Sequence, residues 1–300
     1  MFNIKTVTGI EKVYLNLCKG FDALGIKYTK NLSFNKIKPE DAVIVLGDEL
    51  YQGKDLLKSY NKPNKIIAGI GLITHPSEWP ELFNDYPVAV YLQHCMWANN
   101  LYIKYYGHDK CAEWPAGVDT EKWIPANNIE KKYDFLVYNK IRWDNENQEI
   151  TLKKPIIAKL DQANLSYCEI KYGAYLETDY IRLLKQSKAV IFICEHETQG
   201  FACCEAMSMD IPILAWNPGF CRDPNRFIWN DAVIETSTVP FFDHRCGLTF
   251  LDFDDFNIKI EYFLQSLNNG EYNPRAYIME NLTLKKSAER MLEIINDVYN

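Results

Sequence analysis

Short apolar runs alternate with stretches of helical periodicity along the whole chain. The apolar runs, many of them β-branched, predict buried strands, and apolar positions three or four residues apart predict helices. The predicted strands are residues 2–5, 26–29, 42–46, 66–70, 87–93, 135–138, 169–172, 189–194, 213–216, 232–235 and 247–251. The predicted helices are residues 11–24, 96–106, 151–163, 180–186, 201–209, 256–267 and 284–299. This alternation predicts an α/β fold built from parallel, right-handed βαβ units.

The segment 189–219 is the clearest of these units. Its first strand ends in a polar loop, a helix begins at Phe201 after Gly200, and Asp210 with Pro212 ends that helix before the next strand. In an open parallel sheet, ligands lie at the carboxyl ends of the strands, where the following helix offers unpaired N–H groups to an anion. A phosphate group suits this position.

Two carboxylates flank the predicted phosphate site. Glu197 lies in the loop and Glu205 in the helix, with seven residues between them. Carboxylates beside a phosphate repel it unless they meet hydroxyl groups, and they accept hydrogen bonds from sugar hydroxyls well. The combination therefore indicates a nucleotide sugar as the ligand.

Three further segments join this pattern in a family resemblance. They are the glycine at Gly9, the segment 116–125 (AGVDTEKWIP) and the segment 135–142 (FLVYNKIR), and they precede the segment 197–214 with its E-x7-E spacing. All four follow one another along the chain in the order found in a single enzyme family. Together they resemble retaining glycosyltransferases of the GT-B fold, family 4 type (glycosyl transferases group 1), in a short form. The loop after Glu197 reads Thr-Gln-Gly where the family has Gly-Phe-Gly, so the sugar preference carries over least.

The resemblance implies two Rossmann-like lobes, a shortened acceptor-side lobe at 1–122 and a nucleotide-sugar lobe at 123–300, with the C-terminal helix crossing back to the first lobe. It implies that Glu197 contacts the transferred sugar, that Glu205 holds the ribose, and that Lys140 and Arg142 face the diphosphate. The other donor-binding residues that it implies are Thr198, Gln199, Gly200, Phe201, Gly9 and Tyr172. The implied activity is metal-independent transfer of a sugar, with retention, to a glycan, a lipid-linked or another hydroxyl acceptor, as in polysaccharide biosynthesis. No cofactor is implied besides the donor.

Two histidines are candidates for the acceptor side. His75 lies in a loop beside Pro76, where a lone histidine is more often a surface residue than a catalytic one. His94 follows the strand 87–93 and precedes Cys95. Neighbouring side chains on a strand point to opposite faces, so a Cys–His catalytic pair is not expected there.

Composition and charge exclude several classes of protein. A hydrophobic content of 47% over 300 residues predicts ordinary globular domains, about two on the usual prior. Residues 1–120 carry 13 Lys and 13 acids, so the net charge of −7 lies in the remainder, and no basic field is present for nucleic acid. No apolar run approaches the roughly 20 residues of a membrane span, which leaves only weak peripheral membrane contact open. The nine Cys contain no C-x-x-C pair and predict free thiols and a cytoplasmic location.

Two alternatives stay open at this point. Asp252 and Asp254 follow an apolar run and mimic the D-x-D metal site of GT-A glycosyltransferases, although an acidic helix start explains them equally well. The second alternative is a nucleotide-sugar-binding protein of GT-B fold that has lost its chemistry together with part of the first lobe.

Overall fold

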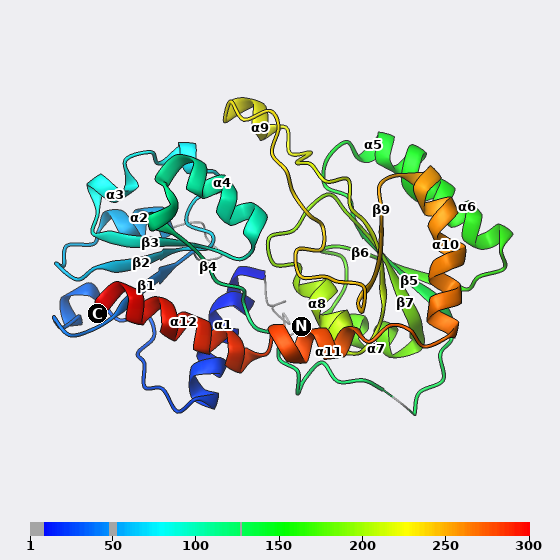
Figure 1. The fold of residues 1–300 in the computed structure, drawn as a ribbon, viewed down its shortest axis with the longest axis horizontal. Helices are drawn as coiled ribbons and strands as arrows, with labels where there is room; N and C mark the ends of the chain where they lie inside the picture. Colours follow the sequence, from blue (N-terminus) through cyan, green and yellow to red (C-terminus); the bar gives the residue numbers. More distant parts are fainter. Residues whose placement is uncertain (1–8, 48–52, 127) are drawn as a thin grey trace, which may run out of the picture. The chain divides into compact units, whose positions relative to one another are not determined.

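The computed structural model describes residues 9–47, 53–126 and 128–300. These residues form two compact units, each with its own parallel sheet (Figure 1). Unit 1 contains the chain up to Gly117 and the segment Leu282–Asn300, and unit 2 contains Val118–Asn281. The predicted first strand at 2–5 lies outside the described residues.

Unit 1 is built on a four-stranded parallel sheet with the strand order β1-β2-β3-β4. The strands are β1 (Val43–Leu46), β2 (Ile66–Gly69), β3 (Val88–Gln93) and β4 (Cys111–Glu113). All four residues of β2 are buried, as expected of a central strand covered on both faces. The helices of this unit are α1 (Gly9–Ala23), α2 (Gly53–Lys58), α3 (Leu82–Asp85), α4 (Met96–Tyr106) and α12 (Leu284–Tyr299), with short 3₁₀ turns at Phe34–Lys36, Pro76–Glu78 and His108–Lys110.

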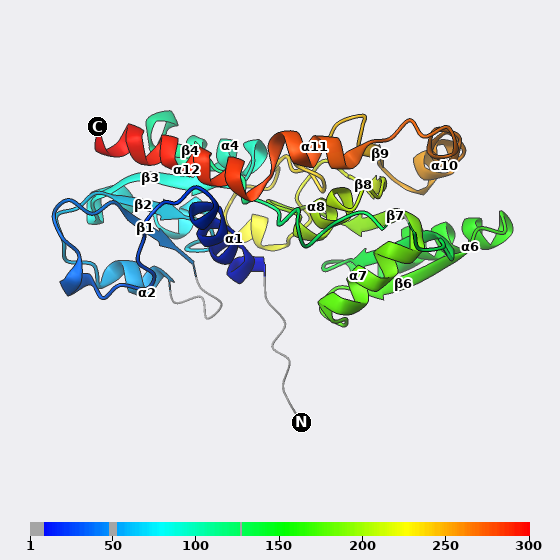
Figure 2. The ribbon, with the colours of Figure 1, turned by 90° about the horizontal axis from the view of Figure 1, so that it is seen from below.

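The C-terminal helix α12 packs on α1, as predicted, and both views show the two helices side by side (Figures 1 and 2). A Cβ atom at Gly20 would lie 2.8 Å from the Cβ of Ala288, so the helices touch where α1 has no side chain. The indole Nε1 of Trp114 donates to the carbonyl of Ser287 (2.9 Å), and the hydroxyl of Tyr299 accepts from the backbone N–H of Val43 (2.8 Å). The last helix is therefore an integral part of unit 1.

Unit 2 carries a five-stranded parallel sheet with the strand order β6-β5-β7-β8-β9. The strands are β5 (Tyr133–Lys140), β6 (Tyr167–Lys171), β7 (Ser187–Cys194), β8 (Ile213–Trp216) and β9 (Gly247–Phe250). The helices are α5 (Asn145–Gln148), a π-helical turn (Glu149–Lys153), α6 (Lys154–Gln162), α7 (Glu177–Gln186), α8 (Phe201–Ser208), α9 (Asn225–Ile228), α10 (Phe253–Asn268) and α11 (Pro274–Asn281).

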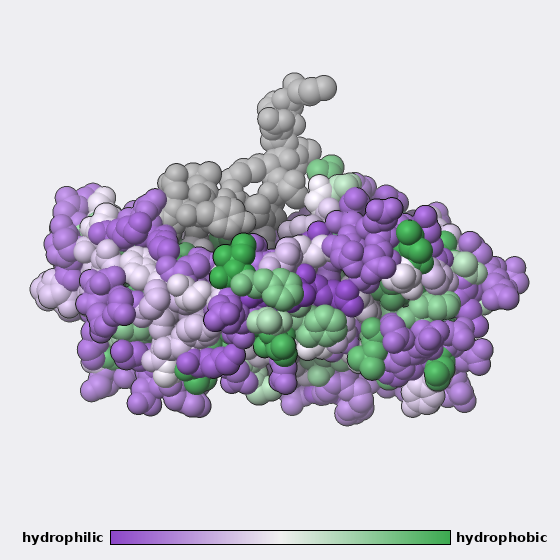
Figure 3. All heavy atoms as spheres, turned by 90° about the horizontal axis from the view of Figure 1, so that it is seen from above, coloured by the Kyte–Doolittle hydropathy of each residue, from purple (hydrophilic) through white to green (hydrophobic). Residues whose placement is uncertain are grey.

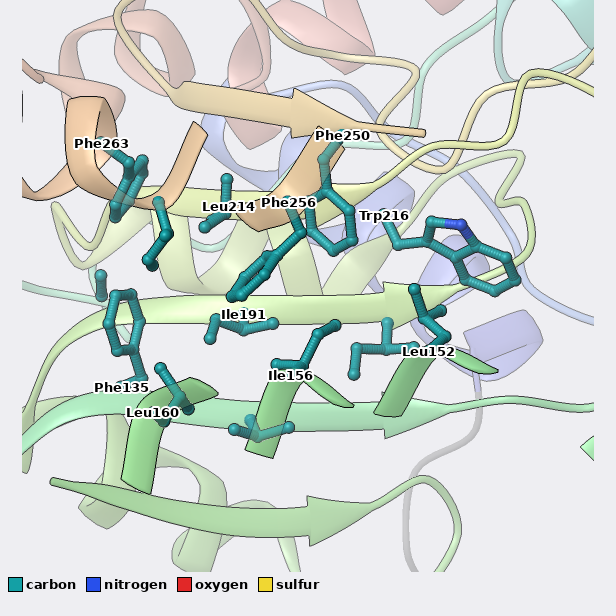
Figure 4. Close-up of a cluster of buried hydrophobic side chains, with 14 of the residues drawn as sticks. Phe135, Leu152, Ile156, Leu160, Ile191, Leu214, Trp216, Phe250, Phe256 and Phe263 are labelled. Atoms are coloured by element: carbon teal, nitrogen blue, oxygen red, sulfur yellow. The ribbon is translucent and has the colours of Figure 1, made fainter. Parts of the chain in front are cut away.

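The main core of unit 2 lies between the sheet and the helices α6 and α10. Figure 4 shows side chains of the strands, among them Phe135, Ile191 and Leu214, meeting Ile156 of α6 and Phe256 of α10. All five side chains are 0% exposed, so this part of the core is shielded from water. Removing so much apolar surface from water is the main force that holds the sheet and its helices together.

Two predicted strands are wrong. Residues 26–29 pair with no strand among the described residues. The backbone N–H of Ile26 instead donates to the carbonyl of Phe21 (2.9 Å) in the turn after α1, and the ring of Tyr28 packs on the ring of Phe21. Residues 232–235 form a single antiparallel bridge, Phe220 with Glu235, in place of a strand. The short strand β4 and the helices α5 and α11 were not predicted, since none has a marked apolar pattern of its own.

No helix within the described residues is both long and apolar enough to cross a membrane.

Candidate functional site

The loops that follow β5 and β7 lie at the same edge of the unit 2 sheet. The two strands are neighbours in parallel register, and their last residues, Lys140 and Cys194, are direct partners. The polar residues that follow each strand therefore meet side by side, as the sequence pattern predicted for a ligand site at the carboxyl ends.

Lys140 and Glu197 form an ion pair at this edge. Their side chains are 12% and 14% exposed, so water screens the pair weakly. Burial opposes charge on both groups, but the attraction between them outweighs it, so the pKa of Glu197 lies below its usual value and the pKa of Lys140 above its own. Both are charged at neutral pH. The ammonium group also lies over the ring of Tyr172, 4.3 Å from its centroid.

Arg142 lies beside this pair within a stack of rings. Its Nη2 donates to the carbonyl of His196 (3.1 Å), and its guanidinium lies 4.2 Å from the ring centre of Trp143. The Trp143 and His196 rings are themselves stacked at 5.0 Å. Burial, together with the positive charge of Arg142, lowers the pKa of His196 to about 4, so this imidazole is neutral at physiological pH. Lys140 and Arg142 are therefore cations at this edge, whereas His196 is not.

Glu195 fixes the loop after β5 and was not singled out from the sequence. Its Oε1 accepts hydrogen bonds from the backbone N–H groups of Arg142 (2.8 Å) and Trp143 (3.0 Å). The residue is 0% exposed, and its Oε2 is buried with no hydrogen-bond partner among the described residues. The available sequence signal was an acidic residue directly after a buried strand, a position where an unpaired carboxylate is costly.

The loop after β7 turns into α8 through Gly200. This glycine has φ +64°, a left-handed conformation that side chains disfavour, and α8 starts at the next residue, Phe201. The hydroxyl of Thr238 donates to the carbonyl of Cys194 (2.9 Å), and the backbone N–H of Glu197 donates to the carbonyl of Ser237 (3.0 Å). The loop is therefore tied down on the side away from Lys140, and the N-terminus of α8 faces the same edge of the sheet.

The remaining predicted residues of unit 2 differ in exposure. Glu205 lies inside α8 and is 4% exposed, and Gln199 is equally buried. Burial raises the pKa of the neighbouring Tyr180, and the negative charge of Glu205 adds to that shift. Thr198 and Phe201 are half-buried, whereas Tyr172 is 52% exposed.

The residues predicted in the first lobe belong to unit 1. His75 is buried, its Nδ1 lies 2.8 Å from the Oγ of Ser77, and it caps the turn that Pro76 begins. His94 is also buried, with Nδ1 3.3 Å from the carbonyl oxygen of Trp114. Gly9 is exposed at the first position of α1. Both imidazoles thus have structural contacts, and their role toward an acceptor stays a prediction.

Asp252 caps a helix. Its side chain accepts a hydrogen bond from the backbone N–H of Asp255 (2.9 Å) at the start of α10, and Asp254 is exposed in the first turn. Among the residues that the structure describes, no group of three or more His, Cys, Asp or Glu side chains could hold a metal ion. The helix-start explanation of these two aspartates is the one that the structure supports.

The comparisons with known proteins identify the fold. No family model and no curated protein match the sequence. Among solved structures, the chain is similar to AviGT4, a glycosyltransferase involved in avilamycin A biosynthesis, at a TM-score of 0.56 and 13% identity, over 98% of this chain and 90% of that chain. The fold is GT-B. The GT-A alternative built on Asp252 and Asp254 therefore does not hold.

Other GT-B structures give the same result. TarM is similar at a TM-score of 0.57 and 14% identity, over 95% of this chain and 58% of TarM. The lipopolysaccharide outer core galactosyltransferase WaaB is similar at 0.53 and 12%, over 97% of this chain and 83% of WaaB. At such low identities the likeness establishes the GT-B fold alone.

Proposed function

We propose that the protein is a retaining glycosyltransferase that moves a sugar from a nucleoside-diphosphate sugar to a hydroxyl group of a glycan, a lipid-linked or another acceptor. The observation that carries the proposal is the arrangement at the carboxyl ends of β5 and β7. There the Lys140–Glu197 ion pair and Arg142 lie beside the start of α8. This edge combines fixed positive charge with carboxylates, which a diphosphate linked to a sugar requires.

The diphosphate is assigned to the cations and to the α8 N-terminus. Lys140 and Arg142 supply two positive charges, and the helix start adds the partial positive charge of its aligned peptide groups. As the bond between the sugar and the phosphate breaks, negative charge grows on the leaving phosphate, and fixed cations stabilise it without reorganisation. We therefore propose that the reaction needs no metal.

The two carboxylates are assigned to hydroxyl groups. Glu197 is held in place by Lys140 and by the backbone contact to Ser237, so it offers an oriented acceptor to the transferred sugar. Glu205 is assigned to the ribose hydroxyls from inside α8. Because Glu197 is engaged with a cation and with hydroxyls, it is not assigned as a nucleophile.

The proposed chemistry is a front-face substitution. The bond between the anomeric carbon and the phosphate oxygen breaks, and the nucleoside diphosphate leaves with the electron pair. The acceptor oxygen forms its bond to the anomeric carbon on the same face, and its proton passes to the leaving phosphate. Configuration is retained without a covalent enzyme intermediate.

The first experiment is a search for the donor followed by NMR of the product. Among solved structures with this fold, a mutant of S. aureus TarM is in complex with UDP and pneumococcal GtfA is in complex with UDP and GlcNAc, so UDP-sugars are tested first, then GDP- and ADP-sugars. A donor at 100 times its Kd adds about 2.7 kcal/mol of stability, which a thermal shift detects. The anomeric coupling constant of fresh product should show retention. An inverted linkage contradicts the mechanism, and binding without transfer to any acceptor supports the non-catalytic alternative.

A further inference from the structure

A third arginine lies at the ligand edge of the unit 2 sheet, outside the motifs that the sequence singled out. Arg222 follows β8, and β8 is the neighbour of β7, so its loop leaves the sheet at the same edge as Arg142 and Glu195. The loop is held in place by the backbone bond from Cys221 to Ile234 (2.9 Å) and by the bridge that Phe220 makes.

The side chain of Arg222 has no hydrogen-bonding partner in the described part of the chain. All seven arginines of the sequence lie in that part, and the other six donate to protein oxygens. The Nε of Arg222 is buried and unpaired, and the guanidinium rests between Trp216 (5.3 Å to the ring centre) and Phe220 (5.0 Å). The aromatic contacts orient the group and leave its donors unused.

The surroundings of Arg222 place it next to the site already described. Burial lowers the pKa of Arg222, while the negative charges of Asp144 and Glu195 oppose that shift, so these carboxylates are its electrostatic neighbours. Asp144 directly follows Arg142 and Trp143, and Glu195 binds the backbone of both. Arg222 therefore faces the loop after β5 from the opposite side of β7.

A half-buried guanidinium without a protein acceptor is costly unless a ligand supplies one. We propose that Arg222 binds an oxyanion of the donor, with Nε and one terminal N–H donating in a fork to two of its oxygens. The oxyanion is a phosphoryl group of the diphosphate or a carboxylate on the donor sugar. This inference rests on the proposed function, because it concerns the same site, and it adds a residue from a third loop to that site.

The adjoining segment supplies a matched control. Arg226 lies four residues further along the chain, over the ring of Phe227 (4.4 Å), but its Nη1 already donates to the carbonyl of Asp223 (2.9 Å). Phe227 and Ile228 of α9 are 63% and 80% exposed. Figure 3 shows hydrophobic residues scattered among hydrophilic ones on the face that it draws. Arg226 thus has the same charge and an aromatic neighbour in the same segment, but its donor is committed to the protein.

The test is calorimetric titration of the full chain and its variants with pyrophosphate, glucose 1-phosphate and glucuronic acid 1-phosphate, none of which contains a nucleobase. Arg222→Gln should weaken binding about 10-fold, the effect of losing a charge-assisted hydrogen bond. Arg222→Lys, which keeps the charge, should weaken it less, and Arg226→Gln should change it less than about twofold. Thermal melts identify variants that do not fold, and Arg222→Lys then provides the comparison.

The probes distinguish the two sources of the oxyanion. If Arg222 binds phosphate, Arg222→Gln weakens pyrophosphate and both sugar phosphates alike. If it binds a sugar carboxylate, only glucuronic acid 1-phosphate is affected. Unchanged affinity of every probe in folded Arg222→Gln, or no binding of any probe to the unmodified chain, overturns the proposal. Binding that depends on Arg222 without sugar transfer leaves this inference standing while the proposed function fails.

Discussion

The Oε1 of Glu195 lies 2.8 Å from the backbone nitrogen of Arg142, so a buried carboxylate at the end of one strand holds the loop that follows its neighbour. Glu195→Ala removes this acceptor and leaves two partly buried N–H groups, those of Arg142 and Trp143, without it. We expect the free energy of unfolding to fall by about 3 kcal/mol, measured by urea denaturation. Glu195→Gln keeps one acceptor oxygen and should cost about 1 kcal/mol. Equal losses in the two variants would show that the hydrogen bonds are not the source of the effect.

Separate effects on stability and turnover are expected at the Lys140–Glu197 pair. Lys140→Met leaves Glu197 as a buried, uncompensated charge and should cost about 3 kcal/mol of stability, which Glu197→Gln in the same chain should largely restore. Turnover should fall about 100-fold in Lys140→Met and stay low in the double variant, because the leaving phosphate has lost its cation. Recovery of turnover in the double variant would contradict that role.

The same assay addresses the predicted absence of a metal requirement. Arg142→Ala should also lower turnover about 100-fold, whereas EDTA should leave the unmodified protein fully active. A loss of activity in EDTA that Mg²⁺ restores would show that the diphosphate is neutralised by a metal.

The two glutamates of the E-x7-E pattern should differ in what they bind. Glu205→Gln should weaken the binding of free UDP about 10-fold, because a ribose hydroxyl loses a charged acceptor. Glu197→Gln should leave UDP affinity nearly intact and lower turnover, since its assigned partner is the sugar, which UDP lacks. Calorimetry with UDP and initial rates with the donor sugar separate the two effects. Equal loss of UDP affinity in both variants would refute the assignment.

Acid should destabilise the protein through His94. Burial lowers the pKa of His94 from 6.5 to about 4, against the smaller opposing effect of the Trp114 carbonyl. Between these values the unfolded chain binds a proton that the folded chain does not, so stability falls as the pH decreases from about 6.5 to about 4, in total by about 3 kcal/mol. Urea denaturation across this range should give a shallower pH dependence for His94→Gln. His108→Gln removes an exposed imidazole and is the control for the loss of a histidine side chain as such.

Close packing of α1 on α12 makes Gly20 sensitive to substitution. An alanine Cβ there would lie 2.8 Å from the Cβ of Ala288 and closer still to the carbonyl oxygen of Leu284. We expect Gly20→Ala to cost about 2 kcal/mol, because the helices must move apart. Gly9→Ala in the same helix meets no atom within 4 Å and should cost less than about 0.5 kcal/mol. Thermal unfolding of the two variants compares them directly.

Local patterns were sufficient for most strands and helices of both units. The strand β8 and the helix α12 have the predicted bounds because each has a clear apolar pattern, and the helix α4 has them because it runs from the end of a strand to Gly107. The strand predicted at 26–29 failed because a strand needs a neighbour to pair with, and local sequence does not report one. Helix α11 was missed because it packs on α8 without an amphipathic stripe of its own.

The candidate site was only partly visible in the sequence. Lys140, Arg142 and Glu197 stand out because they lie in the segments that carry the family resemblance. Glu195 also follows a predicted strand directly, but its importance, like that of Arg222, depends on distances across neighbouring loops. The ion pair of Lys140 with Glu197 joins residues 57 positions apart, and only the parallel register of β5 and β7 brings them together.

The segment Leu282–Asn300 gives the protein an order of assembly during translation. Unit 2 is one continuous stretch, Val118–Asn281, so all of its residues emerge from the ribosome before the last helix of unit 1 emerges. Until then the nascent chain carries the face of α1 around Gly20 and the indole of Trp114 without the helix that covers them. The N-terminal unit is therefore the last to mature, and its uncovered apolar face is the part of the nascent protein that chaperones are expected to engage.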